Sequence, residues 1–199
     1  GLFISEGSVH VRRSIFRANA AEYGGGLYVG GGRVVLEQNT FVNNEALPLG
    51  GAIAIDAGSV TGANDLVADN AASGAGVYLS GGHLSAIHWT FVNNGRYGVI
   101  ADLGIDVESG SASVNKSIIA AHQDGLCGAG AIARQTLFHR VGRPCIAGAA
   151  CIDNLFGDPR FADPSAGDYH LTPGSAAVDR AYSVDVDYDM DGDIRPVGA

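Results

Sequence analysis

A pattern that recurs about every 25 residues restricts the fold of this chain more than any other feature. In each copy a short run of apolar and small residues ends in asparagine, and the clear copies are residues 14–19, 39–44, 65–70 and 89–94. The terminal asparagines therefore stand at positions 19, 44, 70 and 94, with nearly constant spacing. Such even spacing is typical of a solenoid, in which each repeat forms one coil stacked on the previous coil.

Further strand-like runs lie between successive asparagines, and glycine-containing turns separate them. They are residues 25–29, 51–55, 76–79 and 98–101, and then residues 9–11, 34–36, 60–62 and 84–86. Three short strands per repeat, without helical periodicity, predict an all-β fold: a right-handed parallel β-helix whose coils lie about 4.8 Å apart. A β-sandwich also has short strands and frequent turns, but it does not explain identical residues at this spacing.

Alignment of the coils predicts which side chains lie above one another. One stack should lie inside the solenoid and consist of Phe16, Phe41, Val67 and Phe91. A second stack should form a ladder of amide hydrogen bonds at a turn with left-handed backbone conformation, and it consists of Asn19, Asn44, Asn70 and Asn94. We interpret this ladder as structural support and not as a binding site.

The composition indicates a turn-rich, acidic domain and argues against two kinds of partner. The 199 residues include 30 glycines, and the formal net charge is −9. This charge repels a phosphate backbone, so we expect no nucleic-acid partner. No apolar run reaches the roughly 18 residues of a membrane span, so we expect none in this chain. Residues 1–6 lack the basic start and long apolar stretch of a signal peptide, so we expect a mature fragment or an excised domain.

The repeat fades from about residue 125. We therefore expect β-helix coils over residues 1–124, and over residues 125–199 the last coil or coils and an irregular, Asp-rich C-terminal cap. A solenoid exposes an apolar end, which a cap protects from end-to-end stacking. The apolar residues expected to cover that end are Phe156, Phe161, Tyr169, Leu171 and Val178.

The C-terminal motifs resemble those of a known family. Their order is DPxF at residues 158–161, DYHLxPGSxAxD at residues 168–179 and DxDGDxRP at residues 189–196. This order is similar to that of the extracellular bacterial and archaeal right-handed parallel β-helix repeat proteins with a choice-of-anchor Q domain. The resemblance implies a secreted or surface-held protein with a pectate lyase-like fold, and most members have no established activity. Members usually continue beyond the last motif into a terminal strand and a cell-surface anchor.

All three cysteines lie in the C-terminal segment. They are Cys127, Cys145 and Cys151, and an odd number cannot pair completely within one chain. In an extracellular protein we expect one disulfide, most simply between Cys127 and either Cys145 or Cys151. Three reduced, buried thiols are the alternative. A zinc site would need a fourth ligand at a suitable spacing, and His122 and His139 fit no standard pattern.

Alternating aspartates near the C-terminus form a candidate calcium site. The candidate ligands are Asp187, Asp189, Asp191 and Asp193. Oxygen ligands at alternate positions, followed by Gly192 at a sharp turn, match the opening of a calcium-binding loop. The twelfth loop position is Gly198 where a bidentate Glu is usual, so the loop is incomplete. The alternative is a hydrogen-bonded turn in which Arg195 pairs with one aspartate.

A polar face with the one tryptophan of the chain is a candidate glycan-binding strip. Its residues occupy neighbouring columns of the aligned coils, and they are Arg13, Gln38, Asn64, Asp65, His88 and Trp89. A rigid aromatic ring stacks well on a pyranose ring, so this interpretation requires Trp89 to be exposed beside Asn64 and Asp65. The alternative is a solvated structural face, on which charges such as Arg12 and Glu37 pair between coils.

These observations favour an extracellular or cell-surface β-helix module without catalytic activity, which acts in structure, adhesion or glycan binding. A second hypothesis is a lyase or hydrolase fragment that acts on an acidic polysaccharide. Such an enzyme should present a neighbouring acid pair and a basic residue on one strand face. Because the sequence shows no such constellation, we assign no catalytic residue. A third hypothesis is a filament subunit that associates end to end.

Overall fold

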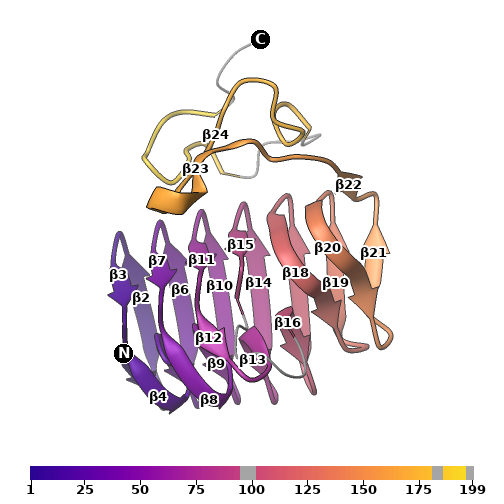
Figure 1. Cartoon of the computed structure of the whole chain (residues 1–199). Helices are drawn as coiled ribbons and strands as arrows, with labels where there is room; N and C mark the ends of the chain where they lie inside the picture. Colours follow the sequence, from indigo (N-terminus) through magenta and orange to yellow (C-terminus); the bar gives the residue numbers. More distant parts are fainter. Residues whose placement is uncertain (95–101, 181–185, 196–199) are drawn as a thin grey trace.

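The chain folds as a parallel β-solenoid of about five turns, which confirms the predicted all-β class. The computed structural model describes residues 1–94, 102–180 and 186–195. The strands of successive coils stack side by side, and the pair of β23 and β24 lies along one flank of the stack (Figure 1). Among the residues that the structure describes, no helix is long and apolar enough to cross a membrane.

The coils build three parallel sheets along the stack. The first sheet has two rows of strands. One row contains β1 (Leu2–Ile4), β5 (Leu27–Val29), β9 (Ile53–Ile55), β13 (Ala75–Leu79) and β16 (Leu103–Val107). The other contains β3 (Ile15–Arg17), β7 (Thr40–Val42), β11 (Leu66–Ala68), β15 (Thr90–Val92) and, at its far end, β22 (Leu155–Phe156). The long strands β18 (Ile118–Cys127) and β20 (Leu137–Ile146) join the two rows.

The other sheets complete the coils. The second sheet consists of β2 (Ser8–Arg12), β6 (Arg33–Glu37), β10 (Ser59–Ala63), β14 (His83–Ile87), β17 (Ser111–Asn115), β19 (Ala131–Arg134) and β21 (Ala150–Ile152). The third consists of β4 (Ala20–Tyr23), β8 (Glu45–Leu49) and β12 (Ala71–Ala72). Outside the coils, β23 (Phe161–Asp163) pairs antiparallel with β24 (Asp168–Leu171), and the 3-10 helix η1 (Pro164–Ala166) joins them.

The register of the strands confirms the predicted internal stack. Phe16 lies opposite Phe41, Phe41 opposite Val67, and Val67 opposite Phe91. The rings of Phe16 and Phe41 are parallel within 4°, with centroids 4.7 Å apart. Because side chains alternate along a strand, this register places every second residue of each strand in the core.

The asparagine ladder is also confirmed. The side-chain amides donate from coil to coil, from Asn19 to Asn44 at 2.8 Å, from Asn44 to Asn70 at 2.9 Å and from Asn70 to Asn94 at 2.9 Å. Each accepting oxygen also receives the backbone N–H of the asparagine before it. The left-handed conformation falls one position earlier than predicted, for example at Asn43 and Asp69. The turn therefore directs the following asparagine inward, where its polar groups are satisfied.

The coils become shorter towards the C-terminus, which explains why the repeat fades in the sequence. Ile118 pairs with Leu137, and Leu137 pairs with Leu155, so paired positions lie closer together in the sequence than Ile15 and Thr40 of the first coils. In the early coils, the chain between the two rows of the first sheet turns away and forms the strands of the third sheet. In the later coils, β18 and β20 each continue from one row to the other as a single strand of 10 residues. The solenoid therefore continues beyond residue 124, as far as β22.

The described part of the C-terminal segment packs along the side of the solenoid, so the expectation that it covers the open end is wrong. Its residues Phe161 and Tyr169 contact an outward-facing apolar row that consists of Ala68, Val92, Ile118, Ala120 and Leu137. The Tyr169 hydroxyl donates to Asp69 Oδ2 at 2.9 Å. Phe156 ends the internal stack and is 70% exposed. The flank offers an apolar row for burial, and this burial favours side packing.

Candidate functional site: an aromatic and acidic outer face

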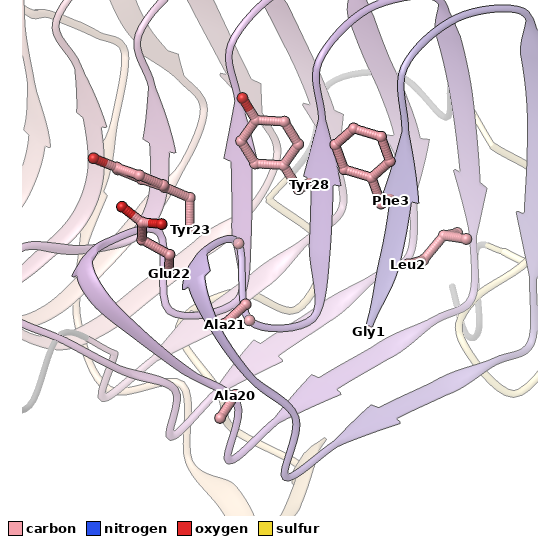
Figure 2. Close-up of a pocket in the computed structure, with 10 residues that line it drawn as sticks. Gly1, Leu2, Phe3, Ala20, Ala21, Glu22, Tyr23 and Tyr28 are labelled. Carbon is pink, nitrogen blue, oxygen red and sulfur yellow. The ribbon is translucent and has the colours of Figure 1, made fainter.

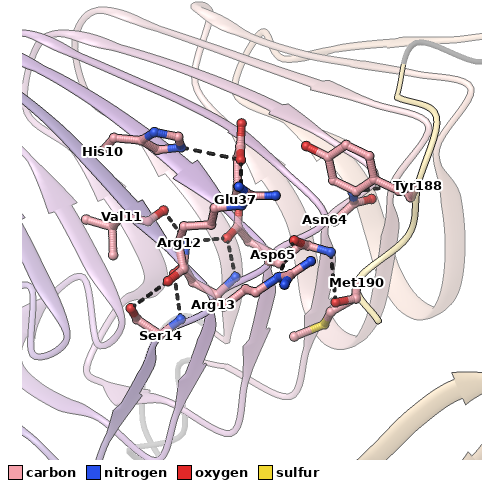
Figure 3. A network of polar contacts seen from close by, with 12 residues as sticks. His10, Val11, Arg12, Arg13, Ser14, Glu37, Asn64, Asp65, Tyr188 and Met190 are labelled. Atoms are coloured by element: carbon pink, nitrogen blue, oxygen red, sulfur yellow. Dashed lines mark hydrogen bonds and ion pairs between the residues drawn. The ribbon is translucent and has the colours of Figure 1, made fainter. Parts of the chain in front are cut away.

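The predicted glycan strip contains a column of turn residues that the chain itself covers. Arg13, Gln38, Asn64 and His88 all have left-handed backbone conformation and so occupy equivalent turns. Residues 186–195, here named the terminal strap, lie across the second and third of these turns (Figure 3). Gln38 and Asn64 are only 4% and 2% exposed as a result. The structure brings these predicted residues together, but it closes part of the surface that they were expected to offer.

Hydrogen bonds to the backbone hold the terminal strap on the turns. Gln38 Nε2 donates to the carbonyl oxygens of Asp189 at 2.8 Å and Met190 at 3.2 Å. Asn64 Nδ2 donates to the carbonyl oxygen of Tyr188 at 2.9 Å, and Arg195 Nη1 donates to Asn64 Oδ1 at 2.8 Å. These side chains therefore act as a dock for the chain's own backbone.

The remaining residues of the predicted strip lie inside the solenoid. Trp89 is 0% exposed and its indole stacks on Phe91 at 5.5 Å, so the expectation that it is exposed for stacking on a sugar is wrong. The column of Trp89 faces the interior, and Gly62 leaves the space that the indole fills. A Cβ atom at Gly62 would lie 2.5 Å from Trp89 Cζ2.

Asp65 belongs to a second ladder of buried polar groups. Its Oδ1 accepts from the backbone N–H of Asn39 at 2.8 Å and from Asn39 Nδ2 at 2.9 Å, and Asn39 Oδ1 in turn accepts from the N–H of Ser14. Burial raises the pKa of Asp65 to about 7, although both hydrogen bonds from Asn39 lower it. Its Oδ2 has no hydrogen-bond partner among the described residues.

The candidate calcium ligands form a hydrogen-bonded turn in the terminal strap. Asp189 Oδ1 accepts the N–H groups of Asp191, Gly192 and Asp193, each at 2.9 Å. Asp191 Oδ2 lies 2.7 Å from His170 Nε2. Arg195 donates to Asn64, and burial lowers the pKa of its guanidinium, although the nearby charge of Asp189 raises it. Within the described ranges, no group of three or more His, Cys, Asp or Glu residues is arranged to hold a metal ion, so calcium binding stays a prediction.

One disulfide is present, but it joins Cys145 to Cys151, with Cα atoms 6.0 Å apart. The expected pairing of Cys127 is therefore wrong, and Cys127 is a free thiol. Cys127 lies opposite Ile146, one position beyond Cys145, so the two cysteines point to opposite faces of the sheet. Cys145 packs against the core, whereas Cys127 faces outward beside Asp106.

The same outward face places acids beside a basic residue. Asp124 and Arg143 lie directly opposite each other on β18 and β20, and Arg143 Nε and Nη2 donate to the two Asp124 oxygens at 2.6 and 2.7 Å. Hydrogen bonding to Asp124 raises the pKa of Arg143, so its guanidinium stays protonated. A guanidinium that is paired in this way is poorly suited to act as a base.

Further towards the N-terminus, this face becomes aromatic. In β5 the side chains of Leu27 and Val29 point into the core, so the ring of Tyr28 points outward. The ring of Phe3 on β1 stacks on Tyr28, with centroids 5.4 Å apart and planes within 9° of parallel. Phe3 is 67% exposed. We name the outward side of β1, β5, β9, β13 and β16 the aromatic face.

A hollow of about 440 Å³ lies where the aromatic face meets the end of β4. Phe3 and Tyr28 form one wall, and Glu22 and Tyr23 lie across from them (Figure 2). The rest of the lining consists of small or aliphatic residues, namely Gly1, Leu2, Ala20, Ala21, Gly24 and Gly25. The hollow therefore combines flat rings, a phenol and a carboxylate within a space suited to a small-molecule group.

Carboxylates accompany the tyrosines along the aromatic face. Tyr28 lies beside Asp56, which helps to raise the pKa of its phenol, and Tyr78 on β13 donates its hydroxyl to Glu108. Ser80 Oγ also donates to Asp56, at 2.7 Å. Burial, followed by these carboxylates, raises the pKa of both tyrosines, so their hydroxyls remain hydrogen-bond donors at neutral pH. Burial also raises the pKa of Asp106.

Alignment of the coils around the asparagines alone does not reveal this face. The paired strands place Phe3, Tyr28, Ala54, Tyr78 and Asp106 in one column. The same register, continued two residues further along each strand, contains Asp56, Ser80 and Glu108. An alignment extended to these columns would have found the aromatic and acidic positions.

No protein-family model, curated protein or solved structure matches the chain.

Proposed function

We propose that the protein is an extracellular, non-catalytic β-helix module that binds a glycan on its aromatic face. The observation that carries this proposal is the parallel pair of the exposed Phe3 and the partly buried Tyr28, which forms one wall of the hollow opposite Tyr23. Flat aromatic rings bury the apolar face of a pyranose ring, and they lose little side-chain entropy when they do so. The nearby hydroxyls and carboxylates supply the polar contacts that orient a sugar.

The chemistry of the face favours binding over catalysis. The hydroxyl of Tyr78 already donates to Glu108, and Arg143 is held by Asp124. Lyase chemistry that uses arginine as the base would need that side chain unpaired, and on the described part of the face Arg143 pairs with Asp124. The proposal therefore assigns Tyr23, Tyr28 and Glu22 to ligand contact only.

Two features support an extracellular location. The disulfide between Cys145 and Cys151 is typical of oxidising compartments. The C-terminal motifs at residues 158–161, 168–179 and 189–196 resemble those of choice-of-anchor Q proteins, which are secreted or held at the surface. We accordingly propose a surface-displayed module, whose stacked coils hold the binding face rigid.

A glycan array followed by affinity electrophoresis tests the proposal. Tyr28→Ala and Tyr23→Ala should each weaken binding roughly three- to tenfold, because each removes one aromatic contact worth about 1 kcal/mol. Phe156→Ala is the matched control, since Phe156 is an exposed ring at the other end of the solenoid. Equal binding by Tyr28→Ala and the unaltered protein, with both folded by circular dichroism, would refute the proposed site.

A further inference from the structure

We infer that the aromatic face selects a cationic amino-sugar polymer, in which the sugar carries a free, protonated amine, over a uronic acid polymer. This inference rests on the proposed glycan-binding function and adds the charge of the ligand. It also separates the molecule from the second sequence-based hypothesis, in which an acidic polysaccharide is the substrate.

The side-chain charge at the hollow is acidic. Among the described residues that line the hollow, Glu22 alone has a charged side chain. It is exposed, and it has no hydrogen-bond or ion-pair partner among the described residues. The N-terminal ammonium of Gly1 also lines the hollow; it carries a positive charge and donates to Asn19 Oδ1 at 2.7 Å. A protonated amine bound between the rings would therefore meet an unpaired carboxylate.

More carboxylates continue along the same face. Asp56 and Glu108 are both exposed; Asp56 accepts a hydrogen bond from Ser80 and lies beside Tyr28, and Glu108 accepts a hydrogen bond from Tyr78. A carboxylate has about four acceptor positions, so one or two neutral donors leave room for an ammonium group. Hydrogen bonds between an ammonium and a carboxylate are charge-assisted and roughly twice as strong as neutral ones.

Basic groups that could bind a uronate are missing from these strands. The sequences of β1, β4, β5, β8, β9, β13 and β16 contain no lysine or arginine. Arg143, further along the sheet, already pairs with both oxygens of Asp124. The net charge of −9 adds a long-range repulsion of polyanions and an attraction of polycations.

The rings and the charges can act on one sugar unit at the same time. An amine on a pyranose ring lies at the rim of the ring, so a sugar stacked on Tyr28 directs its ammonium sideways, towards Glu22 or Asp56. The electron-rich faces of Tyr23 and Tyr28 also attract a cation directly. Stacking thus supplies affinity for sugars in general, and the carboxylates supply the preference for the amine.

Titration calorimetry with three oligosaccharides of equal length tests this inference. The probes are a fully deacetylated glucosamine oligomer, its N-acetylated counterpart and an oligogalacturonate, in mildly acidic buffer in which the amines are protonated. We expect the deacetylated oligomer to bind at least about tenfold more tightly than the acetylated one, which corresponds to one charge-assisted contact. The oligogalacturonate should show the weakest binding, and added salt should reduce the preference for the amine.

Charge-neutral variants locate the effect. Glu22→Gln and Asp56→Asn should each lower the ratio of the two affinities at least threefold, an effect of about 0.7 kcal/mol. Asp153→Asn is the matched control because it removes one exposed carboxylate from a turn of the last coil, and asparagine tolerates the left-handed conformation there. The control should retain the ratio of the unaltered protein.

The possible outcomes separate the two proposals. Equal affinity for the acetylated and deacetylated oligomers would overturn the charge preference while glycan binding stands, and so would a preference for the uronate. A preference that survives both Glu22→Gln and Asp56→Asn would overturn the assignment to this face. Absence of binding to all three probes, together with an array without Tyr28-dependent binding, would overturn the glycan-binding function itself.

Discussion

Two strips that carry polar side chains run along the solenoid: the column of turn residues that contains Gln38 and Asn64, and the aromatic face. They differ in what covers them. The terminal strap lies on Gln38 and Asn64, and the neighbouring Trp89 is buried in the core. On the aromatic face Phe3 remains exposed, and so does Glu22 across the hollow on β4. A polar column in a β-helix therefore indicates a binding surface only when its side chains are not already hydrogen-bonded to another part of the same chain.

Removal of the buried tryptophan should have the largest effect on stability. Trp89→Ala should lower the free energy of unfolding by about 3–5 kcal/mol, because it deletes a fully buried indole and leaves a cavity. Urea denaturation measures the loss, and glycan binding by the fraction that remains folded should not change. A stable Trp89→Ala protein with lost glycan binding would reverse the roles that we assign to the two strips.

Ionisation of Asp65 should produce a stability loss of up to about 4 kcal/mol as pH rises. The folded-state pKa of about 7 lies above the ordinary value of 3.8, so the folded state holds the proton more tightly. The stabilisation is therefore fully present at low pH and is lost as pH rises through the window between these values. Asp65→Asn, which copies Asn39 of the preceding coil, should flatten this profile. Parallel profiles for the two proteins in urea titrations would contradict the burial of a titrating carboxyl.

Loosening of the terminal strap should have an intermediate effect. Asn64→Ala removes the hydrogen bonds to the Tyr188 carbonyl and from Arg195, for a loss of about 1–3 kcal/mol. Hydrogen exchange should accelerate within residues 186–195, for instance at the Arg195 amide that is bonded to the Asp187 carbonyl. Arg12→Ala provides a control on the same side, at an exposed pair with Glu37. Unchanged rates of amide hydrogen exchange in the terminal strap would show that the hydrogen bonds of Asn64 do not hold the strap in place.

Changes on the aromatic face should have the smallest effect on stability. Tyr28→Ala should lower the free energy of unfolding by about 1 kcal/mol, chiefly through the lost stack on Phe3. Thermal unfolding of this variant beside Trp89→Ala gives the direct comparison of the two strips. If Tyr28→Ala were as damaging as Trp89→Ala, the aromatic face would be a structural element and not an open surface.

The sequence was sufficient for the coils but not for the position of the C-terminal segment. The spacing of Asn44 and Asn70 fixes their register, because identical buried amides stack only when coils are aligned. The direction of the terminal strap depends on hydrogen bonds between positions 38 and 189, and no local pattern encodes a contact of that sequence separation. The pairing of Cys145 with Cys151 likewise depends on strand alternation beyond the region where the repeat is clear.

The candidate site was harder to predict than the fold, for a related reason. Trp89 is conspicuous because tryptophan is rare and this one sits among polar residues, but Gly62 on another strand provides its internal space. The pairing of Phe3 with Tyr28 arises from register alone, since neither residue lies in a recognisable motif. Trp89, which the sequence makes conspicuous, is buried, whereas Phe3 and Tyr28, which no motif marks, form the candidate site.

The terminal strap restricts the number of coils that the solenoid can have. A repeat protein tolerates the gain of a whole coil, because each coil contacts only its neighbours. The chain here leaves the stack at β22 and returns to Gln38 and Asn64, so its length must match the number of coils in between. One duplicated coil would displace these docking turns by about 4.8 Å, and Tyr188 would then reach a different turn. The contact between the strap and the turns thus fixes the number of coils in a molecule built from repeats.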